Sequence, residues 1–170
     1  YGSAGSVPED YTGESSAFSV NAGAAAALSV SSGQSQTGAV GAALSTPFTV
    51  SVKDAGNNDV NGTTVTFAVV SGGGSISATT ATTDASGNAS TTLTLGTTVG
   101  ANSVSATVSG LTAVIFDATG TAGNATDTQT TISAAATTGT VSDSTTVSVT
   151  VKDAYGNVRA GDTVNFALTK

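Results

Sequence analysis

The sequence lacks four residue types altogether: cysteine, histidine, methionine and tryptophan. Without Cys, the chain can form neither a disulfide nor a thiolate zinc site. Without His, it has no imidazole, which is the commonest general base and metal ligand. These absences predict that the chain is not an enzyme. We assign no catalytic, cofactor-binding or metal-binding residues from the sequence, and we expect no cofactor.

Charge is also scarce, because charged residues make up 9% of the chain and only four of them are basic. With a formal net charge of −7, the chain cannot neutralise a run of phosphates, so nucleic acid is not an expected partner. No stretch reaches the roughly 18 apolar residues of a membrane span, so none is expected in this segment. Few charges and abundant hydroxyl side chains favour an extracellular, cell-surface location.

The chain is instead rich in small residues, with 32 Thr, 23 Ser, 28 Ala and 21 Gly. Apolar side chains alternate with Thr and Ser, which is the pattern of half-buried strands. In 48–53, for example, Phe48, Val50 and Val52 face one way. Similar runs occur at 65–70, 89–95, 104–108 and 114–118, and turns rich in Gly, Asn and Asp separate them. This pattern predicts an all-β sandwich or barrel. The Ala-rich stretch 22–30 is interpreted as a linker that enters a strand.

One phrase occurs twice, at a fixed offset of 99 residues. Residues 50–69 and 149–168 are identical at eleven of twenty positions, including the alternating apolar residues and the turn between them. A shorter echo pairs the segment ending at Gly23 with the segment ending at Gly120. A unit of about one hundred residues is far longer than the 20–50 residues of solenoid repeats. The sequence therefore predicts domains in tandem.

The repeat divides the chain into three parts. Residues 1–24 are predicted to hold the last strand of a preceding domain, 25–122 a complete domain, and 123–170 the first half of a further domain. That half ends in a predicted strand, "TVNFALTK" (163–170), without counterparts of 76–118. An apolar face should then be left uncovered: Val149, Val151, Val164, Phe166 and Leu168.

The region 48–110 resembles the group 1 bacterial immunoglobulin-like domain, the repeat of invasin- and intimin-type adhesins. The resemblance is carried by "VSVKDAGNND", "TVTF", "SGGGSIS", "TTDASGNA" and "TVGANSVSATV". It covers 25–122 well and 130–170 in part, where Tyr155 and Arg159 depart from the first copy. It implies tandem immunoglobulin-like β-sandwiches, one complete and two partial, used as rigid spacers in large surface proteins. The fold also implies that the first and last strands of each domain pair within one sheet.

Five aspartates lie in predicted turns: Asp54, Asp59, Asp84, Asp153 and Asp162. One interpretation is calcium bound at domain junctions, because calcium takes roughly six to eight oxygen ligands. The favoured interpretation is that each Asp caps its own turn through the backbone. No EF-hand spacing is present, and Asp59 is replaced by Val158 in the second copy.

Other motifs are given structural interpretations. Lys53 and Lys152 could form isopeptide bonds if buried, but the alternation places Lys53 on the solvated face. Glycosylation sequons begin at Asn61, Asn88 and Asn124, about as many as chance predicts. The "SGGGS" run at 71–75 has no Lys after it, so it is a strand connection rather than a phosphate loop.

Three functions are compatible with these features. The favoured one is a rigid spacer or stalk in cell adhesion, with neighbouring immunoglobulin-like domains as partners. The alternative is a subunit of an extracellular filament or surface layer, a homopolymer in which the segment 15–23 of one chain completes the open sheet of the next. The third is a carbohydrate-binding module using Tyr1, Tyr11 and Tyr155, which ranks last because these aromatic residues are scattered.

Overall fold

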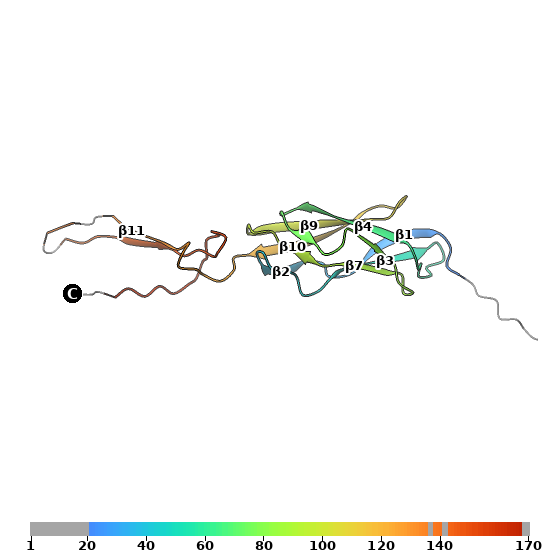
Figure 1. Ribbon diagram of the computed structural model, residues 1–170, viewed down its shortest axis with the longest axis horizontal. Coiled ribbons are helices and arrows are strands. Elements are labelled where there is room, and N and C mark those ends of the chain that lie inside the picture. Colours follow the sequence, from blue (N-terminus) through green and yellow to red (C-terminus); the bar gives the residue numbers. More distant parts are fainter. Residues whose placement is uncertain (1–20, 136–137, 141–142, 168–170) are drawn as a thin grey trace, which may run out of the picture.

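The computed structural model describes residues 21–135, 138–140 and 143–167, and within these ranges the chain is all-β. Residues 25–121 form two facing sheets, with strand orders β1-β3-β7 and β2-β10-β9-β4-β6 (Figure 1). The first sheet contains β1 (Ala25–Ser32), β3 (Phe48–Asp54) and β7 (Asn88–Thr91). The second contains β2 (Gln36–Ala39), β10 (Val114–Thr121), β9 (Gly100–Thr107), β4 (Thr64–Ser71) and β6 (Thr80–Thr82). This arrangement confirms the predicted immunoglobulin-like sandwich.

The core lies between the two sheets and is built from the predicted alternating positions. Phe48 from β3 and Phe116 from β10 stack with ring centroids 4.6 Å apart and an interplanar angle of 9°. Around this pair lie buried side chains from both sheets: Val50, Val52, Val65, Phe67, Ala89, Leu93, Leu95, Val104, Ala106 and Ala118. The alternation holds because successive side chains of a strand point to opposite faces, and only one face of each sheet meets the other sheet.

The N-terminal segment of the domain belongs to both sheets. The Ala-rich stretch forms a strand from Ala25, as the alternation favoured, and β1 pairs with β3 antiparallel. After Ser32 the chain crosses to the other sheet, where β2 pairs with β10 in parallel. The expectation that the first and last strands pair needs correction, since β1 and the last strand, β10, lie in different sheets. The strand that pairs with β10 is instead β2, which follows β1 in the chain.

Short strands complete the domain beside the two main sheets. The "SGGGS" run connects β4 to β5 (Ser75–Ile76), as predicted, and β5 pairs with β8 (Leu93–Thr94). In the described part of the chain, no helical segment has the length and apolar character that crossing a membrane requires.

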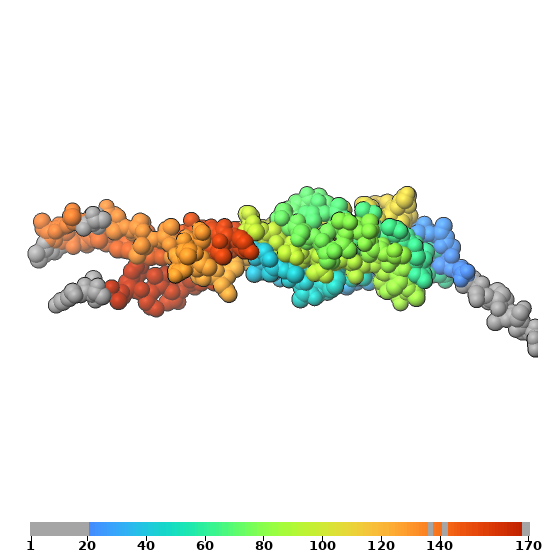
Figure 2. Space-filling view, viewed as in Figure 1, coloured from blue at the N-terminus to red at the C-terminus, as the bar shows by residue number. Residues whose placement is uncertain are grey.

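A second unit, residues 123–167, follows the complete domain along the long axis of the molecule (Figures 1 and 2). It contains one hairpin of β11 (Thr131–Ala134) and β12 (Val147–Thr150). The predicted strand at 163–170 is not formed over its described residues, 163–167. Its counterpart β4 is held by β9 and β6, and the residues equivalent to those two strands are absent from 123–170. A strand without partners leaves its backbone polar groups unpaired.

The same sequence is buried in one unit and exposed in the other. Phe67 is 1% exposed, whereas its counterpart Phe166 is 63% exposed. Val65 and Val164 show the same contrast, at 0% and 40%. This confirms the predicted uncovered face at Val164 and Phe166, while Val149 and Val151 are half-buried. Leu168 lies outside the described residues, as do residues 1–20, which carry most of the predicted last strand of a preceding domain.

Candidate functional site

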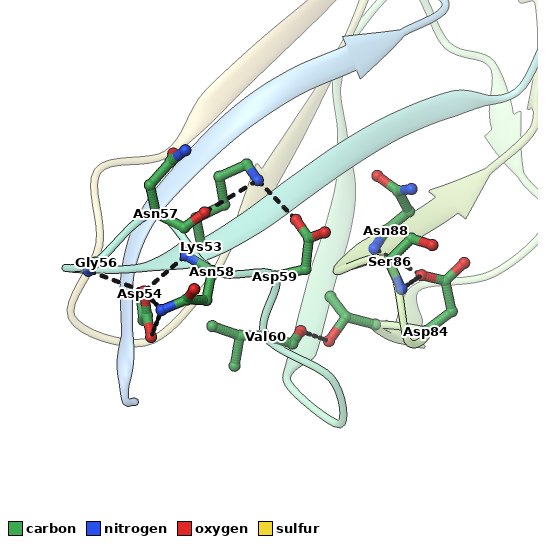
Figure 3. A network of polar contacts seen from close by, with 11 residues as sticks. Lys53, Asp54, Gly56, Asn57, Asn58, Asp59, Val60, Asp84, Ser86 and Asn88 are labelled. Atoms are coloured by element: carbon green, nitrogen blue, oxygen red, sulfur yellow. Dashed lines mark hydrogen bonds and ion pairs between the residues drawn. The ribbon is translucent and has the colours of Figure 1, made fainter. Parts of the chain in front are cut away.

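The repeated turn at the end of β3 is organised by one carboxylate, that of Asp54 (Figure 3). Its Oδ1 accepts hydrogen bonds from the backbone N–H groups of Gly56 (2.9 Å) and Asn58 (2.8 Å), and the Asn58 side-chain amide donates to both carboxylate oxygens. Its Oδ2 accepts a further bond of 2.7 Å from the N–H of Gly23. The carboxylate therefore holds its own turn and also the segment that leads into the domain.

The second copy repeats this arrangement atom for atom. Asp153 accepts bonds from the N–H groups of Tyr155, Asn157 and Gly123, each 2.9 Å long, and from the Asn157 amide. The structural counterpart of Gly23 is therefore Gly123, three residues beyond the Gly120 that the sequence echo had paired with it. The glycine lies 31 residues before its aspartate in the first copy and 30 in the second, so the fixed offset of 99 that relates the aspartates does not relate the glycines.

Hydrogen bonding lowers the pKa of both carboxyl groups. The Asn58 amide and N–H, with the N–H of Gly23, lower the pKa of Asp54 from 3.8 to about 2. For Asp153, burial acts to raise the pKa, but the bonds from Asn157, Gly123 and Tyr155 outweigh it and lower the pKa to about 2. Because donors stabilise the charged form, both side chains remain carboxylates through the ordinary acidic range.

These pKa values predict acid-sensitive stability of the complete domain. A carboxyl group with a lowered folded-state pKa stabilises the fold fully above its unfolded pKa, near 3.8, and loses that contribution as the pH falls through about 2. We expect the urea midpoint to fall between pH 4 and pH 2, and Asp54→Asn to flatten this dependence while lowering the midpoint at pH 7. The matched control is Asp117→Asn, at an exposed aspartate on β10. Equal pH profiles for the two variants would contradict the assignment.

The other three aspartates divide between two roles. Asp84 caps its turn, as predicted, by accepting bonds from the N–H groups of Ser86 (2.8 Å) and Asn88 (3.0 Å). The capping prediction is wrong for Asp59 and Asp162. Asp59 pairs with the ammonium group of Lys53 at 2.7 Å, and Asp162 with the guanidinium of Arg159 at 2.7 Å. Within the described ranges, acidic side chains nowhere gather in a group of three that could hold a metal ion.

The remaining candidates lie apart from one another. Lys53 is partly exposed and ion-paired, which agrees with the solvated interpretation of that side chain. Of the sequon residues, Asn61 and Asn124 are exposed and Asn88 is half-buried. Among the three tyrosines, Tyr155 lies where the two units meet, and Tyr1 and Tyr11 fall outside the described residues.

The second unit contacts the complete domain through the side chain of Asn157. Its Nδ2 donates to the carbonyl oxygen of Thr97 (2.9 Å), and its Oδ1 accepts from the N–H of Val99 (3.2 Å). The same amide also donates to Asp153, which accepts a bond from the linker glycine, Gly123. The Asn157 side chain therefore connects its own turn, and through Asp153 the linker, to the preceding domain. This role of Asn157 was not predicted from the sequence. Its only signal was that the same residue type, Asn, stands at 58 and 157 in the two copies.

Comparison with known proteins gives matches among solved structures only. No protein-family profile matches the chain, and no curated protein matches it. The adhesin FdeC of Escherichia coli is 28% identical over 81% of this chain and 45% of its own, with a TM-score of 0.57. Invasin, a bacterial integrin-binding protein, is 28% identical over 80% of this chain and 28% of its own, with a TM-score of 0.46. A fragment of intimin in complex with its translocated receptor is 28% identical over 65% and 38%, with a TM-score of 0.44.

The chain thus spans less than half of the length of each of these proteins. The match to FdeC supports the resemblance to bacterial immunoglobulin-like adhesins. Membership of group 1 in particular stays a prediction.

Proposed function

We propose that this chain is part of the stalk of a large extracellular protein in cell adhesion, where its immunoglobulin-like domains act as rigid spacers and not as an enzyme. The observation that carries the proposal is the end-to-end contact of two repeated units, in each of which the same carboxylate-centred turn holds the glycine that leads into the unit. The similarity to an Escherichia coli adhesin over most of the chain supports the same assignment. The domain division 1–24, 25–122 and 123–170 is part of this proposal.

The strand topology suits a domain that is pulled at its two ends. Strand β2, which follows β1 near the start of the domain, and the C-terminal strand β10 run parallel and pair over four positions, from Gln36↔Ala118 to Ala39↔Thr121. Pulling residues 24 and 122 apart shears these pairs together instead of unzipping them one by one. The linker glycine held by each Asp adds a further bond close to the point of load.

A domain exchange in the producing cell tests the spacer function. Residues 25–122 are replaced by an unrelated immunoglobulin-like sandwich of similar length, or deleted. A spacer contributes reach and stiffness, so we expect adhesion to survive the exchange and to weaken on deletion. The readout is cell attachment at equal surface expression, measured with an antibody to another part of the protein. Loss of attachment on exchange would show instead that this domain binds the ligand itself.

A second candidate function, the self-assembling filament, is favoured by the exposed apolar side chains of the second unit. Ile132, Val147, Val164 and Phe166 are all exposed there, and an open sheet recruits strands from other chains. The denatured mass of the protein from its native source separates the two candidates. A mass near 16.1 kDa would favour strand exchange between chains, whereas a mass many times larger would favour a long tandem stalk.

A further inference from the structure

The two copies of the turn differ at one informative position, where Gly56 corresponds to Tyr155. The turn forms in the same way around both residues, because Asp54 and Asp153 accept the same backbone bonds. The residue that follows has a positive φ in both copies, 66° at Asn57 and 85° at Gly156. The turn itself therefore does not require the tyrosine ring, so the presence of the ring at 155 must be explained by contacts outside the turn.

That ring lies against the complete domain at Gly41, just after β2. A Cβ added to Gly41 would stand 2.4 Å from the Oη of Tyr155, 2.7 Å from its Cζ and 2.9 Å from its Cε2. Such distances are shorter than any non-bonded contact, so the ring occupies the space that a side chain at 41 would need. Gly41 also has φ +73° and donates its N–H to the carbonyl oxygen of Gly96 (3.0 Å). Tyr155 is 54% exposed, so its ring touches this fixed piece of backbone with its hydroxyl end while the rest faces solvent.

Tyr155 and Asn157 contact different loops at the same end of the complete domain. The ring meets Gly41, and the Asn157 amide is bonded to Thr97 and Val99. One contact alone would allow the second unit to rotate about it, but two contacts on separate loops fix an orientation. A groove of about 410 Å³ runs beside the linker, next to the loop that Asn157 contacts. It is lined by Val99, Gly120, Thr121, Ala122, Val158, Arg159 and Ala160.

We propose that Gly41 and Tyr155 are a matched pair that fixes the orientation of this joint, and that the end of the complete domain is an interaction surface for a following immunoglobulin-like domain with an aromatic residue at this turn position. The inference rests on the proposed spacer function and names the residues that make the spacer stiff. The turn at 54–58 has Gly56 in place of the ring, so a joint built on it would lack this contact. The pair thereby distinguishes one junction of the chain from another.

The test measures the joint directly in the full chain. The sequence has no Cys, so spin labels can be placed on two introduced cysteines at exposed positions, Ala68→Cys on β4 and Ser148→Cys on β12. Electron–electron double resonance then gives the distribution of distances between the units. We expect a narrow distribution in the parent and one about twofold broader in Tyr155→Gly, because one of two fixed points is lost. The substitution introduces the residue that the other copy of the turn already contains.

Gly41→Ala supplies the second half of the test, because its clash depends on the ring. We expect it to shift or broaden the distribution in the parent, and to add nothing in a Tyr155→Gly background. The matched control is Gly110→Ala, where φ is +80° and no atom lies within 4 Å of an added Cβ. It carries the same backbone strain without the clash, so its distribution should equal that of the parent.

The possible results test the pairing of Gly41 with Tyr155 separately from the proposed spacer function. If the distance distribution is narrow in the parent and Tyr155→Gly leaves it unchanged, the Gly41–Tyr155 pairing is wrong and the proposed spacer function still stands. A broad parent distribution overturns the stiffness on which the spacer itself depends. Additive effects of Gly41→Ala and Tyr155→Gly would also overturn the pair, since independent residues do not relieve one another.

Discussion

Phe67→Ala is expected to destabilise the complete domain by about 3–5 kcal/mol, the usual cost of removing a buried aromatic side chain. Phe67 is fully buried on β4 among the residues of the core. Its removal leaves a cavity between sheets that are fixed by their own hydrogen-bond ladders, so the site cannot collapse to fill the space. A domain of this size has roughly 5–15 kcal/mol in total, so the variant should unfold at much lower urea. Circular dichroism through a urea titration measures the change.

The repeat provides an unusually close control in Phe166→Ala. The substitution is the same, and the flanking residues are Val164 and Ala167 in place of Val65 and Ala68. Because Phe166 is exposed, its removal should change the unfolding free energy of this chain by no more than about 0.5 kcal/mol. An equal loss in both variants would mean that the second unit buries its phenylalanine in solution.

Gly96→Ala is expected to cost about 3 kcal/mol, the upper end of the range for overpacking a well-packed interior. A Cβ at residue 96 would lie 1.8 Å from the carbonyl oxygen of Gly72. The obstacle is backbone and not a flexible side chain, so relief requires the segment after β4 to move away from the segment after β8. That movement also disturbs the bond from the N–H of Gly96 to the buried amide of Asn102 (3.1 Å). Thermal unfolding of the full chain measures the loss.

The matched control for Gly96 is Gly73→Ala, in the segment that crosses it. An added Cβ at Gly73 meets nothing within 4 Å, but the residue has φ +68°. Its cost is therefore the strain of a left-handed residue alone, about 1–2 kcal/mol. A larger loss at Gly73 than at Gly96 would show that backbone strain, and not the close approach of the two segments, limits this part of the fold.

Much of the fold could be predicted because burial follows the alternation along each strand. Phe48, Val50 and Val52 were expected on one face, and all three are fully buried. The turn at Asp54 was likewise predictable, since an Asp with Gly and Asn after it bonds to its own backbone. The predictions for Asp59 and Asp162 were wrong because a basic side chain close in sequence, Lys53 or Arg159, takes the carboxylate in place of the turn backbone.

The sequence by itself determined the all-β class, the repeated unit and the inward-facing residues, because these depend on a period of two and on turn residues that act over a few positions. Only the tertiary structure decided that β2 rather than β1 lies beside β10, that Gly123 is the counterpart of Gly23, and that Tyr155 rests on Gly41. Each of these depends on residues far away in the chain, and a local pattern carries no information about whether such partners are present.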